Sequence, residues 1–160
     1  VFADGILVPH FSACDGLPEG VTICGMADQL RTNPTRLRDE LGSMLTQHVH
    51  GFTAMNSAFV RDGAFIEINP DIVIDRPIEL VYLSAAGGEG MLALPRNLLL
   101  LRAGSKATIL ERYLSANAER SLTNAVTEVL LEDTKMLQEK AIDASEKHPK
   151  HAFQIFQRVT

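Results

Sequence analysis

The chain has 160 residues, of which 46% are hydrophobic and 22% are charged, and its formal net charge at pH 7 is −5. This length and composition are those of a folded globular domain with room for a core, and they exclude a disordered segment. The negative charge argues against a nucleic acid or an anionic membrane as partner, because both are bound through clustered Lys and Arg.

Two features bear on where the protein works. Cys14 and Cys24 are the only cysteines, and the lack of a C-x-x-C pair or a dense cysteine framework is typical of the reducing cytoplasm. No apolar run reaches the about 18 residues that a membrane span needs, and the first residues lack the basic-then-apolar order of a signal peptide. We therefore expect a cytoplasmic protein. Because the chain begins with Val1 and ends within a strand-like run, we also expect a fragment of a longer protein.

The first 63 residues are predicted to form a mixed strand and helical region. Residues 1–24 contain short β-like stretches separated by glycines and prolines. Asn33 followed by Pro34 predicts a helix start, because Asn caps helix N-termini and Pro suits the first helical position. A second helix is predicted over residues 52–60, and we expect Gly63 to end it in a left-handed conformation.

From residue 64 the sequence changes to short runs rich in β-branched and aliphatic residues, broken by Pro, Gly and Asp. The predicted strands are residues 64–68, 72–74, 78–84, 97–101, 107–114, 123–131, 136–142 and 153–159. Only residues 143–151 are polar enough and long enough to form a helical crossover. A sandwich or a parallel β-helix remains as the architecture.

Some of these runs repeat. Residues 101–113 and 130–142 each pass from an apolar end through a short turn into a new run, and the turn residues Gly104 and Asp133 lie 29 residues apart. A looser copy places its turn at Asp71, which is 33 residues before Gly104. Repetition at this period indicates one supersecondary unit stacked on the next, which favours the β-helix and a platform rather than an active site.

Four segments of the chain, residues 55–66, 76–80, 95–98 and 122–129, resemble in order and spacing the SufB/SufD family of iron–sulfur cluster assembly proteins. The run TNAVTE at 123–128 and the run NSAFVRDG at 56–63 resemble the SufD branch. The cysteine-centred motif of the SufB branch is not seen here. One departure is Pro70, which is shifted from the place of the proline in the family's turn.

The resemblance implies a mainly β fold, a right-handed parallel β-helix preceded by a small α-helical N-terminal region. We accordingly expect residues 1–63 to form the N-terminal strand and helical region, and residues 64–160 to form the first rungs of a β-helix core that is truncated at its C-terminus. The resemblance also implies a non-catalytic scaffold subunit of the SUF complex, working with a SufB-like paralogue and an ABC-type ATPase. The full complex handles an iron–sulfur cluster transiently. We expect this fragment to contain no catalytic residue and to bind no metal or cofactor.

Few residues suggest chemistry of their own. His48 and His50 would share one face of a strand, but their segment reads as helix-like, which favours surface histidines over a metal site. Cys14 and Cys24 could accept sulfur or iron as thiolates, or they could be small buried hydrophobes. The sequence contains no complete P-loop, because its Gly-rich stretches lack either the following Lys-Ser/Thr or the upstream glycine.

Three glutamates recur at similar points in successive predicted strands. Glu111, Glu128 and Glu139 could line a stack of carboxylates. An exposed ladder, in which each carboxylate pairs with a nearby Arg or Lys, is the plainer interpretation.

Two other classes of protein stay open. A carbohydrate-active enzyme on a β-helix would need convergent carboxylates and aromatic platforms, and the absence of Trp and the presence of only two Tyr count against it. A small ligand-binding β-barrel would join consecutive strands by hairpins. Because residues 153–159 would leave an unpaired strand edge, we also expect the fragment to self-associate there.

Overall fold

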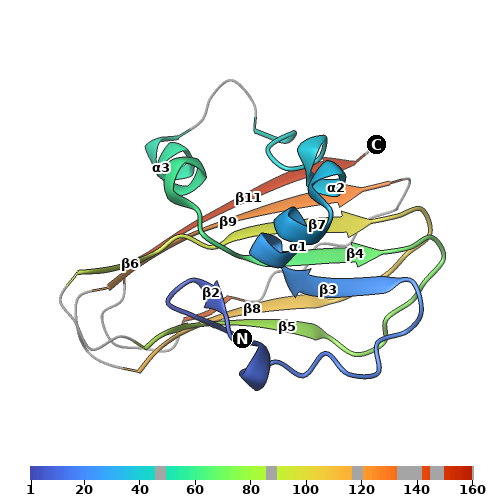
Figure 1. Cartoon of the computed structure of the whole chain (residues 1–160), viewed down its shortest axis with the longest axis horizontal. Coiled ribbons are helices and arrows are strands. Elements are labelled where there is room, and N and C mark those ends of the chain that lie inside the picture. The colour runs from blue at the N-terminus through green and yellow to red at the C-terminus, as the bar shows by residue number, and fades with distance from the viewer. Residues whose placement is uncertain (46–49, 86–89, 117–120, 133–141, 145–149, 160) are drawn as a thin grey trace.

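The structure, a computed structural model, describes residues 1–45, 50–85, 90–116, 121–132, 142–144 and 150–159, with the last two ranges described by their backbone alone. Its described strands lie in two sheets (Figure 1). The first sheet contains, in spatial order, β10 (Ile142–Ala144), β8 (Ile109–Ser115), β5 (Ile78–Ser84), β1 (Phe2–Ala3) and β2 (Ile6–Leu7). The second sheet contains β11 (Lys150–Val159), β9 (Ser121–Leu131), β7 (Arg96–Leu101), β4 (Ala64–Ile68) and β3 (Val21–Gly25), and β6 (Met91–Ala93) also pairs with β9.

The helices are short and lie before β4 in the chain. A 3-10 helix, η1 (Pro9–Phe11), follows β2, and α1 (Met26–Thr32), α2 (Pro34–Arg38) and α3 (Gly51–Phe59) follow β3. Asn33 is the N-cap residue of α2 and Pro34 opens it, which confirms the predicted start. Figure 1 shows α1, α2 and α3 over one face of the second sheet, with α3 set apart from the other two.

The second sheet is the middle layer of the fold. Alternate residues of β7 enter different cores: Leu99 and Leu101 pack between the sheets, whereas Leu98 and Leu100 pack under α1 and α2. This is why the LLLL run of β7 is buried on both faces, because such runs occur where both sides of a sheet are covered. The core between the sheets also contains Phe2 and Tyr82.

The 33-residue repeat corresponds to parallel neighbours. Phe65 pairs with Leu98 in parallel between β4 and β7, and an isolated parallel bridge joins Val73 to Lys106. The turn at Asp133, on which the 29-residue spacing depends, lies outside the described residues, as does most of the predicted strand at 136–142. The predicted strand at 72–74 contributes only the bridge at Val73.

The predicted fold class is wrong. The protein has an α/β fold with two mixed sheets and few helices, and not a right-handed parallel β-helix. Each sheet contains an antiparallel pair, β1 with β2 and β3 with β4, beside its parallel pairs. The reason for the error is that a sequence repeat indicates only that the repeated strands are parallel neighbours in a sheet. Parallel pairing does not by itself require the strands to coil into a β-helix. The small ligand-binding β-barrel would join consecutive strands by hairpins. From β4 onward, however, no described strand pairs with the next one in the chain.

No helix within the described ranges is long and apolar enough to cross a membrane.

Candidate functional site

Of the cysteines and histidines considered in the sequence, the structure describes Cys14, Cys24 and His50. Cys14 is exposed and Cys24 is half-buried in β3, and both are free thiols. Burial and the nearby carboxylates of Asp28 and Asp62 raise the pKa of Cys24 to about 11. His50 is the exposed N-cap residue of α3, and His48 lies outside the described residues. Across the described ranges, no three His, Cys, Asp or Glu side chains gather as metal ligands would.

The prediction of an exposed glutamate ladder is wrong for the two glutamates that the structure describes. Glu111 is 5% exposed and Glu128 is 0% exposed, and they lie on β8 and β9 in different sheets. Glu139 lies outside the described residues. A carboxylate this buried needs internal hydrogen-bond donors or cations, and both glutamates have them.

Glu111 belongs to a chain of hydrogen bonds that joins the two sheets. The Tyr82 hydroxyl donates to Asn97 Oδ1 (2.7 Å), and Asn97 Nδ2 donates to Thr127 Oγ1 (3.0 Å). Thr127 Oγ1 donates to Glu111 Oε1 (2.7 Å), and the Tyr113 hydroxyl donates to Glu111 Oε2 (3.0 Å). This series of hydrogen bonds therefore runs from β5 in the first sheet to β7 and β9 in the second, and returns to β8 in the first. Such a fully buried network fixes the register of the facing sheets.

The two tyrosines of this network stack on each other, with ring centroids 5.0 Å apart. Burial raises the pKa of Tyr82 well above the ordinary value, and the negative charge of Glu111 adds to this shift. The same two causes raise the pKa of Tyr113. Because ionisation is easier in the unfolded chain, the stability contributed by the neutral phenols is complete below about pH 10 and is lost as pH rises further.

We expect alkaline titration to show this directly, since Tyr82 and Tyr113 are the only tyrosines in the chain. Phenolate absorbance should appear in one cooperative step that coincides with the loss of circular dichroism. In denaturant, both phenols should instead titrate gradually near pH ~10. Gradual titration near that pH in a chain that keeps its circular dichroism would contradict the burial of the network.

Glu128 forms a buried ion pair on the helix-covered face of the second sheet. Arg96, which is 3% exposed, donates to Glu128 Oε1 from Nε (3.0 Å) and Nη2 (2.5 Å). The same carboxylate accepts two backbone hydrogen bonds, one from the Gly42 N–H to Oε1 (2.9 Å) and one from the Met44 N–H to Oε2 (3.4 Å). The pair therefore fixes the segment after α2 to β7 and β9.

Helix α3 is held on the sheet by hydrogen bonds rather than by apolar packing. Asn56 Nδ2 donates to the carbonyl oxygens of Pro95 (3.0 Å) and Asn124 (2.8 Å). Asn124 Nδ2 donates back to the Phe52 carbonyl (2.7 Å), and Arg96 Nη1 donates to Ser57 Oγ (3.2 Å). The helix is thus fixed in position and in rotation.

A third polar cluster lies where α2 meets the ends of β4 and β7. Glu67 lies between two guanidinium groups, accepting from Arg36 Nε (3.0 Å) and from Arg102 Nε (2.9 Å). Arg102 also pairs with Glu132 and, at 3.8 Å, with Glu40. Burial lowers the pKa of Arg102, but its hydrogen bonds to Glu67 and Glu132 outweigh that effect and the pKa is raised. The cluster is a set of paired charges that attaches α2 to the sheet.

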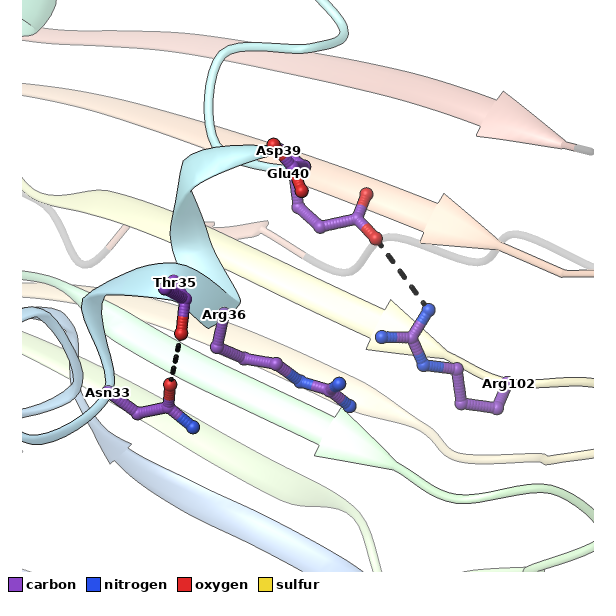
Figure 2. Close-up of a pocket in the computed structure, with 6 residues that line it drawn as sticks. All are labelled: Asn33, Thr35, Arg36, Asp39, Glu40 and Arg102. Atoms are coloured by element: carbon purple, nitrogen blue, oxygen red, sulfur yellow. Dashed lines mark hydrogen bonds and ion pairs between the residues drawn. The ribbon is translucent and has the colours of Figure 1, made fainter.

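This cluster borders an open polar pocket of about 300 Å³. The pocket is lined by Asn33, Thr35, Arg36, Asp39, Glu40 and Arg102. Figure 2 shows the Arg36 side chain extending along the pocket toward Arg102, and the Glu40 side chain, above it in this view, reaching the guanidinium group of Arg102. Because the two arginines are engaged by glutamates, the pocket offers neither a nucleophile beside a base nor free cations for an anion.

Comparison with known proteins decides the family. The sequence model of the family described as "SufBD protein N-terminal region" matches residues 2–80. An iron–sulfur cluster assembly SufBD family protein of Porphyra purpurea is 33% identical over 92 residues, which are 58% of this chain and 18% of the relative. The chain belongs to the SufBD family. Another SufBD family protein, from Synechocystis, is 28% identical over 116 residues, or 71% of this chain and 25% of the relative.

This SufBD chain spans only about a fifth to a quarter of the length of these relatives. Its match to the family's N-terminal region includes α1, α2 and α3 and the strands β1 to β4. The resemblance noted in the sequence is therefore confirmed at the level of the family.

Sequence reasoning missed the residues that hold the SufBD chain together over long separations. Asp62, which is 5% exposed, accepts the backbone N–H groups of Leu7 (2.8 Å), Ala27 (3.0 Å) and Gly63 (2.9 Å). In the sequence it stands only as the residue before Gly63, where the predicted helix ends. Its position within the run NSAFVRDG was the available signal, but its partners are up to 55 residues away.

Proposed function

We propose that the chain is part of a SufD-like scaffold subunit that acts in the cytoplasm in iron–sulfur cluster assembly. In this proposal the subunit pairs with a SufB-like paralogue and an ABC-type ATPase, and the cluster is the cargo of the whole complex. The subunit itself catalyses no step, and this part of it retains no cluster.

The observation that supports the proposal is the burial of polar side chains in the SufD-like run at 123–128. Its Asn124, Thr127 and Glu128 side chains are at most 4% exposed, and each makes hydrogen bonds inside the fold. A catalytic or cluster-binding side chain must reach its substrate. These three side chains join α3, the segment after α2 and the two sheets, so they are not available to a substrate or a cluster, which supports the proposal of a non-catalytic subunit.

Co-purification tests the proposal. The full-length protein that contains this chain is tagged and expressed with the SufB-like paralogue and the ABC-type ATPase of the same organism, and with each of them alone. We expect a complex that contains all three proteins, and no ATP turnover by the tagged protein alone. Capture of neither partner, or ATP turnover that persists in the isolated protein, would contradict the proposal.

A further inference from the structure

Helix α3 buries polar side chains and exposes aromatic ones. Thr53 and Asn56 are 0% exposed, whereas Phe52 is 49% and Phe59 is 66% exposed. A helix on a globular core normally does the reverse, because apolar burial is what stabilises its docking. Here the hydrogen bonds of Asn56 and Asn124 dock the helix instead, and Phe52 and Phe59 stay largely exposed beside the buried Asn56.

Phe52 and Phe59, with the half-buried Met55 between them, form an apolar strip. Phe52, Met55 and Phe59 are spaced i, i+3 and i+7, and therefore follow one side of α3 over two turns. Phe59 also lines a hollow of about 60 Å³ together with Leu92 of β6, which is 43% exposed. We call Phe52, Met55, Phe59 and Leu92 the α3 stripe. An apolar strip of this kind on a folded surface marks an interaction site.

A free cation lies at the rim of the α3 stripe. Arg61 lines the same hollow, is exposed, and makes no hydrogen bond or ion pair with any residue of the described ranges. The carboxylate in this hollow, Asp4, is already engaged by the backbone N–H of Ala85 at 2.9 Å. A cation beside an apolar strip selects a partner that carries an acid next to its apolar side chains.

We propose that the α3 stripe docks an amphipathic helix of a partner protein, with apolar residues at i, i+3 or i+4 and i+7, and with an acidic side chain that pairs with Arg61. A ridge of partly exposed apolar side chains over two helical turns is a surface against which a second helix packs. A second copy of α3 fits less well, because α3 carries no acidic residue and both Arg61 side chains would stay unpaired. This inference rests on the proposed function, because a scaffold subunit needs faces that other subunits cover.

Site-specific photo-cross-linking in the host cell tests the docking face. Benzoylphenylalanine replaces Phe59 in the full-length protein, and in a control it replaces Val73, which is 54% exposed and lies away from α3. We expect a cross-link from position 59 only, to one peptide of another protein that has the stated apolar spacing and an acidic residue. A synthetic peptide of that segment should bind Phe59→Glu and Arg61→Glu at least about tenfold more weakly than wild type, and Val73→Glu as wild type.

Charge exchange provides the sharpest check. A peptide whose acidic residue is replaced by Lys should recover affinity for the Arg61→Glu protein. Cross-linking to a second copy, to another segment of the same chain, or equally from position 73 would overturn the proposal, as would no cross-link from position 59. Co-purification of the wild-type complex is a separate result. If it succeeds while the cross-link fails, the proposed function stands and the docking face does not.

Discussion

Replacing Gly63 by alanine is expected to destabilise the protein by about 3 kcal/mol or more, because the added methyl group has no room. A Cβ at this position would lie 1.8 Å from the carbonyl oxygen of Arg96 and 2.7 Å from its backbone nitrogen. Neither atom can move without shifting the start of β7, where Arg96 pairs with Glu128. The sequence had assigned Gly63 to a left-handed turn, but its φ is not positive, and the requirement is close backbone approach.

Urea unfolding measures this effect, and Gly51 supplies a matched control. A Cβ at Gly51 would meet no atom of the described residues within 4 Å beyond its own helix and chain neighbours, and its φ is not positive. Gly51→Ala should therefore be neutral or stabilise α3 by up to about 1 kcal/mol. The account of Gly63 is wrong if Gly63→Ala and Gly51→Ala unfold at the same urea concentration.

Breaking the buried Arg96–Glu128 pair should have an effect of similar size. Arg96→Met leaves the Glu128 carboxylate buried without its cation, and such a change costs about 3–5 kcal/mol. Glu128→Gln should also be costly. The double variant should lose less stability than the sum of the two single losses, because no uncompensated charge remains.

The exposed pair Arg31–Asp28 is the control for this experiment, since its side chains are 77% and 52% exposed. Arg31→Met should change the stability by less than about 1 kcal/mol. Hydrogen exchange gives a second readout, because Glu128→Gln should speed the exchange of the Gly42 amide that this carboxylate accepts. Additive losses in the double variant would show that the pair does not act as a unit.

The sequence was most informative where a strand is defined by its own residues. The bounds of β4 and β5 agree with the predicted runs at 64–68 and 78–84, because dense apolar stretches flanked by Gly or Pro leave little freedom. Helix α1 was missed because its N-cap residue, Gly25, makes no side-chain cap, and the capping carboxylate of Asp62 comes from 35 residues beyond Ala27. A cap that distant has no local signature.

The same reason accounts for the errors at the candidate site. Glu111 and Glu128 were predicted to be exposed because isolated carboxylates usually are. Their burial depends on Thr127 and Arg96, which are 16 and 32 residues away and are brought close by the packing of the two sheets and by the pairing of β7 with β9, respectively. The family was predicted correctly from short runs whose polar residues are buried in the fold. The arrangement of the sheets was not, because it depends on the antiparallel pairs at the sheet edges, β1 with β2 and β3 with β4, which leave no repeat in the sequence.

Genetic complementation tests the proposed SufD-like role most directly. The full-length protein is expressed in two bacterial strains under iron limitation, one that lacks its SufD protein and one that lacks its SufB protein, and the activity of a [4Fe–4S] enzyme is measured. We predict recovery of that activity in the strain without SufD and none in the strain without SufB. Recovery only in the strain without SufB, or in neither strain although the protein is expressed and folded, would contradict the assignment.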